Sequence, residues 1–69
     1  MQISARNVLS GRVKAVTLGV VSAEVVVELS GGEEIVSVVT RRSAEELGLS
    51  EGKEVSVVVK ATSVMIALE

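Results

Sequence analysis

The sequence predicts an all-β protein, a five-stranded barrel with one short helix between its third and fourth strands. Three observations predict it. Apolar and polar residues alternate along most of the chain, which is the period of two typical of strands with one buried face. Valine is the commonest residue, and its β-branched side chain fits a pleated surface. Short glycine-containing segments interrupt the alternation at intervals and mark turns.

The first two strands are expected over residues 7–17 and 20–29. In the first strand, Leu9, Val13 and Ala15 are expected on one face. In the second strand every odd position is apolar, while most even positions are polar. Both segments therefore predict strands that bury one face only.

A turn, a third strand and a helix follow. Ser30-Gly31-Gly32-Glu33 predicts a hairpin, because paired glycines accept the positive φ of a tight turn. Residues 34–40 return from it as the third strand. Ser43-Ala44-Glu45-Glu46 has the spacing of a capping box, with Ser43 as N-cap. The segment therefore predicts a helix of one or two turns that ends at Gly48.

Two more strands complete the expected fold. Residues 54–61 alternate again, and residues 63–68 place Val64, Ile66 and Leu68 on one face. The order strand, strand, strand, short helix, strand, strand is that of the OB barrel, a five-stranded Greek-key structure. A small barrel of the SH3-like type is the alternative on pattern.

Length and composition limit how such a domain is stabilised. With 69 residues, the chain is expected to form one domain over residues 1–69, near the lower size limit for a stable core. It has no Cys, His or Asp, so disulfides and the usual zinc and calcium ligands are missing. Oligomerisation is the remaining means of stabilisation. Val20, Val26 and Val58 fall on otherwise polar faces and predict a subunit interface.

Charge and composition also exclude classes of function. The net charge is −2, and no aromatic residue is present, which disfavours nucleic-acid binding through a basic groove and stacked bases. The chain lacks a pair of base and nucleophile, so we expect no enzyme. It shows neither a signal pattern nor an apolar run of roughly 18 residues, and a cytoplasmic location is expected.

Hydrogen-bond donors are concentrated in two short segments, Ser4-Ala5-Arg6-Asn7 and Lys60-Ala61-Thr62-Ser63. Each alone is an ordinary polar arm or hairpin corner, and Thr40 ends the third strand. Together they offer a guanidinium fork, an ammonium charge, hydroxyls and loop amides, which suit a doubly charged tetrahedral oxyanion. Composition does not choose among phosphate, sulfate, molybdate and tungstate.

Several segments carry a resemblance to a known family. They are Ser4-Ala5-Arg6-Asn7 with Gly11, Gly19 to Val25, Ser43 to Leu49 with Glu51-Gly52, Val59 to Thr62, and Val64 to Ile66. Together they resemble the molbindins, the small Mop-type proteins that bind molybdate and tungstate. The resemblance spans the whole chain. It implies an OB-type barrel, assembly as a hexamer built as a trimer of dimers, and storage of the oxyanion.

The resemblance further implies two classes of oxyanion site between subunits. The first joins the N-terminal motif of one subunit to donors of a neighbour: Ser4, Ala5 and Arg6 against Thr40, Lys60, Ala61 and Thr62. The second lies near three-fold axes and uses the loop that enters the second strand: Gly19, Val20, Val21 and Ser22. Arg6 and Lys60 would neutralise the dianion, and no side chain would bind the metal directly.

Two other functions stay open beside this interpretation. The chain is alternatively a structural or regulatory oligomerisation module without a ligand. An OB-type nucleic-acid binder is the second alternative, although composition speaks against it. No cofactor is expected beyond the oxyanion itself.

Overall fold

The computed structural model describes residues 4–69, and within them the chain forms four strands, one α-helix and one 3₁₀ turn. The elements in chain order are β1 (Asn7–Leu18), β2 (Ser22–Leu29), β3 (Glu34–Thr40), α1 (Arg41–Glu46), β4 (Glu54–Val59) and η1 (Ala61–Ser63). The short helix lies between the third and fourth strands, as the sequence predicts.

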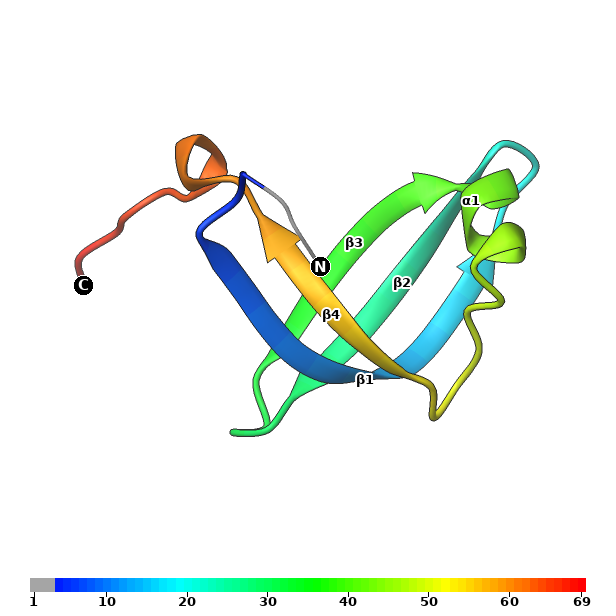
Figure 1. Ribbon diagram of the computed structural model, residues 1–69, viewed down its shortest axis with the longest axis horizontal. Helices are drawn as coiled ribbons and strands as arrows, with labels where there is room; N and C mark the ends of the chain where they lie inside the picture. Colours follow the sequence, from blue (N-terminus) through cyan, green and yellow to red (C-terminus); the bar gives the residue numbers. More distant parts are fainter. Residues whose placement is uncertain (1–3) are drawn as a thin grey trace.

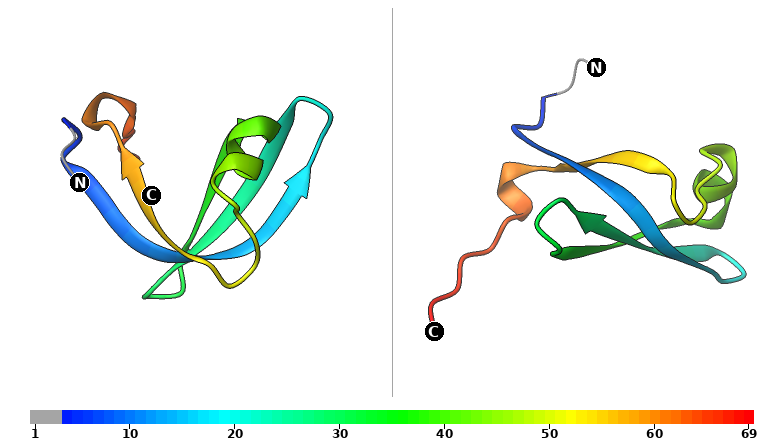
Figure 2. Two further views of the ribbon diagram at one scale, coloured as in Figure 1. Left: turned by 45° about the vertical axis from the view of Figure 1, so that its right-hand side comes forward. Right: turned by 90° about the horizontal axis from the view of Figure 1, so that it is seen from below.

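The strands form one antiparallel sheet in the order β3-β2-β1-β4. Three hairpin-connected strands followed by a fourth that returns beside the first is the Greek-key arrangement. The sheet curls into a half-barrel that stays open between its two edge strands, β3 and β4 (Figures 1 and 2). The all-β Greek-key prediction is confirmed, but within the described chain the barrel has four strands and not five.

The predicted fifth strand, residues 63–68, belongs to no sheet. β4 ends at Val59, and the η1 turn, closed by a 2.8 Å hydrogen bond from Ser63 N–H to the Lys60 carbonyl, directs the chain away from the sheet. The last residues project from the domain (Figure 1). The alternation marks an apolar face, but a strand also needs a partner for its backbone, and residues 4–69 supply none.

The core lies between the sheet and the loop after α1. Val13, Val25 and Val27 are buried there. Partly buried residues from the strands and the loop after α1 pack against them: Val16, Leu29, Val39, Leu49, Val55 and Val57. The apolar odd positions of β2 thus face the core, as expected, except that Val21 lies in the preceding turn and is exposed.

A β-bulge in β1 corrects one predicted face. The pairing of β1 with β2 shifts between Val13 and Ala15, so Lys14 is an extra residue in the ladder. An extra residue reverses the alternation beyond it. Val16 therefore packs against the core, while Ala15, predicted on the buried face, is exposed.

The predicted helix is present, but its N-cap is Thr40 and not Ser43. The Thr40 side chain accepts a hydrogen bond from the Ser43 N–H over 3.0 Å. Gly48 follows the helix with a φ of +64°, as expected for the residue after a C-cap. Among residues 4–69, no helix has the length and hydrophobicity needed to cross a bilayer.

Candidate functional site

The two donor segments lie at the same end of the sheet. Asn7 pairs with Val59 at the ends of β1 and β4, and the Asn7 side-chain amide donates to the Val59 carbonyl over 3.1 Å. Arg6 directly precedes Asn7, and Lys60 directly follows Val59. The start of β1 and the η1 turn accordingly lie together, away from α1 (Figures 1 and 2). The structure thus brings Ser4, Ala5 and Arg6 to the end that carries Lys60, Ala61 and Thr62.

Arg6 and Lys60 are the basic residues that have no partner within residues 4–69. Both are exposed. The other five of the seven basic side chains bond to carboxylates or carbonyls: Arg12, Lys14, Arg41, Arg42 and Lys53. No acidic residue precedes Glu24 in the chain. This end therefore carries positive charge that no side chain of the described chain compensates, a condition that favours an anion.

Thr40 lies at the other end of the sheet. It pairs with Ser22 across β2 and β3, whereas Lys60 follows β4 at the opposite end (Figure 1). Its hydroxyl also donates to the Ser43 hydroxyl over 2.8 Å, so the side chain serves the helix cap. One copy therefore cannot place Thr40 and Lys60 on the same oxyanion. In the predicted first site, Thr40 has to come from a different copy than Lys60.

The loop predicted as the second site, residues 19–22, is a tight and exposed connection between β1 and β2. Gly19 N–H donates to the Ser22 carbonyl over 2.7 Å. The side chains of Val20 and Val21 are 93% and 76% exposed. In the described part of the chain, the N–H groups of these two valines have no hydrogen-bond acceptor. The loop therefore presents two free backbone donors beside the Ser22 hydroxyl.

Arg41, which no sequence pattern singled out, holds this loop from the first residue of α1. Its Nη1 donates to the Gly19 carbonyl over 3.2 Å, and its backbone N–H donates to the Val21 carbonyl over 2.8 Å. Its Nε lies 3.4 Å from a Glu45 carboxylate oxygen. The contact joins residues 22 positions apart, so it depends on the β2–β3 pairing that the local sequence does not reveal.

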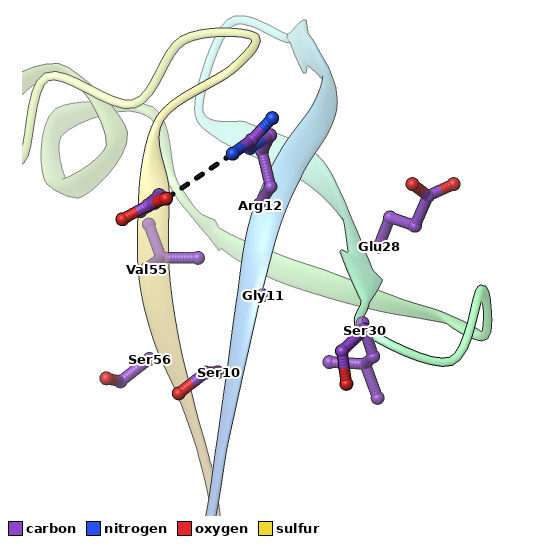
Figure 3. A pocket seen from close by; sticks show the side chains of 9 residues that line it. Ser10, Gly11, Arg12, Glu28, Ser30, Val55 and Ser56 are labelled. Atoms are coloured by element: carbon purple, nitrogen blue, oxygen red, sulfur yellow. Dashed lines mark hydrogen bonds and ion pairs between the residues drawn. The ribbon is translucent and has the colours of Figure 1, made fainter.

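A hollow of about 600 Å³ on the sheet contains none of the predicted site residues (Figure 3). The Arg12 guanidinium inside it is paired with Glu54 at 3.3 Å, and Glu28 adds a second carboxylate. Net negative charge opposes a dianion there. Within residues 4–69, His, Cys, Asp and Glu side chains form no group of three that could hold a metal ion.

Comparison with known proteins first gives the class of the domain. Residues 3–66 match the TOBE domain, and the chain belongs to this family. Within it, the chain is one of the Mop molybdenum-pterin-binding proteins, or molbindins, which confirms the resemblance. It is 54% identical over 66 residues to molybdenum-pterin-binding protein 2 of Clostridium pasteurianum, covering 96% of this chain and 97% of that protein.

Two solved structures have a similar fold over most or nearly all of this chain. A molybdate-binding protein from Sporomusa ovata is 37% identical with a TM-score of 0.92, covering 99% of this chain and 100% of that one. The cytoplasmic molybdate-binding protein ModG, with molybdate bound, is 54% identical with a TM-score of 0.86, covering 88% of this chain and 43% of that one.

Proposed function

We propose that this chain binds molybdate or tungstate between copies of a homo-oligomer and stores the oxyanion in the cytoplasm without transforming it. The observation that carries the proposal is the pair of cations at one end of the sheet, Arg6 and Lys60, which have no partner within residues 4–69. Membership of the Mop family supports the choice of ligand, since relatives are named for molybdenum-pterin or molybdate binding. ModG, named as cytoplasmic, supports the location.

In the first site, the end that carries both donor segments would face the same region of a neighbouring copy. Ser4, Ala5 and Arg6 of one copy would then meet Lys60, Ala61 and Thr62 of another. The two cations neutralise the dianion, and hydroxyls and amides orient its oxygens. Thr40 of a further copy would complete the set. The ligand keeps all its oxygens, and no side chain replaces one.

The second site is the loop of residues 19–22. Its exposed amides at Val20 and Val21 and the hydroxyl of Ser22 would donate to an oxyanion near a three-fold axis. Gly19 suits the tight turn, because a Cβ at this position would lie 3.0 Å from the Ser22 carbonyl oxygen. Like the first site, this site would be completed by neighbouring copies of the chain.

Exposed apolar surface supports the homo-oligomer, which we propose to be a hexamer built as a trimer of dimers. Met65, Ile66 and Leu68 are 93%, 87% and 96% exposed in the isolated chain. Val20 is also almost fully exposed, and Val58 is exposed on the outer face of β4. The three exposed apolar side chains of the tail lie within four residues of the chain and support an interaction surface there.

The hydrogen-bond donors of the proposed sites suit the binding of an oxyanion better than the binding of a pterin or the catalysis of a reaction. The chain has no aromatic ring on which a flat pterin would stack. It also has no His, Cys or Asp to serve as a base or nucleophile. A donor-only site binds and releases its ligand unchanged.

Isothermal titration with molybdate tests the first site through Arg6→Ala and Lys60→Ala. Each variant loses charge-assisted hydrogen bonds worth about 1.5–3 kcal/mol, which corresponds to roughly 10- to 150-fold weaker binding. Arg42→Ala is the matched control, because Arg42 is an exposed arginine at the far end that pairs with Glu46. Unchanged molybdate affinity in both site variants would refute the assignment. Native mass spectrometry of the same samples gives the number of subunits and bound oxyanions.

A further inference from the structure

We infer that Arg41 is the cation of the second oxyanion site and that it also holds the residue 19–22 loop in its binding conformation. The inference rests on the proposed function of that loop and adds to it a charged residue. Arg41 is the basic residue whose side chain reaches this loop within residues 4–69.

The position of the guanidinium is fixed on two sides. Nη1 donates to the Gly19 carbonyl over 3.2 Å, and Nε lies 3.4 Å from the Glu45 carboxylate. The side chain of Arg41 is still 43% exposed. A guanidinium has five N–H donors, and these two contacts use two of them. Three donors therefore remain available beside the loop.

A cation beside the loop would strengthen such a site. The loop's own donors, the amides of Val20 and Val21 and the hydroxyl of Ser22, are neutral, whereas molybdate is a dianion. Neutral donors offset part of the desolvated charge, and a cation offsets more of it. An arginine supplies both charge and directed hydrogen bonds to an oxyanion.

Arg41 also removes an unfavourable group from the loop. A carbonyl oxygen repels an anion, and the Gly19 carbonyl lies in the same turn as the free amides. Only one of the two hydrogen bonds that would close residues 19 and 22 is formed in the described chain, from Gly19 N–H to the Ser22 carbonyl. The Gly19 carbonyl accepts from Arg41 instead. This contact offsets part of the negative charge on the Gly19 carbonyl oxygen.

A substitution at Glu45 tests the effect of the Arg41 charge by an expected gain in affinity. Its carboxylate offsets part of the charge on Arg41, and it belongs to the same helix. Glu45→Gln removes this opposing charge and leaves Arg41 its contact with Gly19. Stronger binding in that variant is expected if Arg41 acts on the anion by its charge. A purely structural Arg41 would give no such gain.

The experiment compares Arg41→Gln with Arg42→Gln by titration with molybdate and by native mass spectrometry. The two substitutions remove the same charge and one i,i+4 ion pair each, but of the two side chains Arg41 alone has a hydrogen bond to the loop within residues 4–69. Arg41→Gln should weaken the second class of binding events at least tenfold and leave the class sensitive to Arg6→Ala intact. Arg42→Gln should behave as the wild type. Arg41→Lys should restore part of the affinity, and Glu45→Gln should raise it.

Hydrogen exchange gives a readout of the loop without any ligand. The Gly19 amide, which donates to the Ser22 carbonyl, should exchange faster in Arg41→Gln than in Arg42→Gln. If the wild type shows two classes of binding events and Arg41→Gln changes neither, the role of Arg41 is overturned, but the proposed second site is not. A wild type with only the class that Arg6→Ala removes would overturn both. If the wild type binds no molybdate at all, the proposed function itself is refuted.

Discussion

The side-chain amide of Asn7 donates to the carbonyl of Val59 over 3.1 Å and ties together residues 52 positions apart in the chain. The two residues also face each other in the antiparallel pairing of β1 with β4. As a result, Arg6 and Lys60 extend from one end of the sheet. Backbone register positions the two cations, and the Asn7 side chain fixes the end of the ladder, where strands would otherwise fray.

Asn7→Ala tests whether this tie positions the oxyanion site. We expect a loss of about 0.5–1.5 kcal/mol of stability, the usual contribution of one hydrogen bond, and weaker molybdate binding although no charge is changed. Urea unfolding and titration calorimetry measure the two effects. Ser56→Ala on β4 is the control, because that exposed hydroxyl makes no side-chain hydrogen bond among residues 4–69. Wild-type affinity in Asn7→Ala would show that the tie is irrelevant to binding.

Substitutions at Thr40 and Ser43 can distinguish the role of Thr40 in helix capping from its proposed role in ligand binding. Thr40→Val removes the oxygen that accepts from Ser43 N–H, and loss of an N-cap costs about 1 kcal/mol of stability. Thr40→Ser should keep the cap, and Ser43→Ala should keep the backbone donor. Circular dichroism during heating measures the stability. If Thr40 of another copy also binds the oxyanion, Thr40→Val weakens molybdate binding more than Ser43→Ala does. Equal binding by the two variants would remove Thr40 from the first site.

The sequence predicts those features that depend on neighbouring residues. The β2–β3 hairpin follows from alternation and from Gly32, whose φ is +91°. Two of the errors in the fold concern information that is not local. The bulge at Lys14 depends on how β1 pairs with β2, and the segment after Ser63 lacks a partner strand within residues 4–69, which no periodicity can reveal.

The same distinction applies to the candidate sites. Arg6 and Lys60 are recognisable because their short motifs are rich in donors, and the β1–β4 pairing then brings them to one end. The distance of Thr40 from that end follows from topology alone. So does the contact of Arg41 with Gly19, which joins the helix to a loop across the sheet.

Gly11 lies where β1 is paired on both sides, with Leu29 and with Val55. A Cβ at this position would be 2.5 Å from Val27 Cγ1 and 2.9 Å from the Glu28 carbonyl oxygen. Gly11→Ala should therefore destabilise the domain by about 1–3 kcal/mol through overpacking. Gly31→Ala is the control, because the atoms nearest to its Cβ would be those of the flexible end of the Glu33 side chain. Denaturation midpoints that do not differ would contradict the close packing at Gly11.

Lys14, the bulged residue of β1, forms an ion pair with Glu34 at the start of β3. The hydrogen bond and charge of Glu34 raise the pKa of Lys14 above its ordinary value of 10.5. Because the folded pKa is the higher one, this stabilisation is complete below 10.5 and is lost as the pH rises through the raised value. The melting temperatures of the wild type and Lys14→Met should therefore differ at neutral pH and converge at strongly alkaline pH. A constant difference across that range would argue against the ion pair.

Ile66, in the exposed tail after η1, gives a direct test of the proposed link between assembly and binding. Burying an isoleucine side chain contributes about 1.5–3 kcal/mol. Because the Ile66 side chain is 87% exposed in one chain, a second copy that covered it would supply most of that free energy. Ile66→Asp should shift the protein to smaller species in light scattering after size exclusion. Because the proposed sites lie between copies, the same variant should also lose molybdate binding, although Arg6 and Lys60 are intact. Glu69→Gln controls for charge in the tail. An Ile66→Asp variant that stays assembled would show that Ile66 lies outside the interface, and a dissociated variant that still binds molybdate would refute the intersubunit sites.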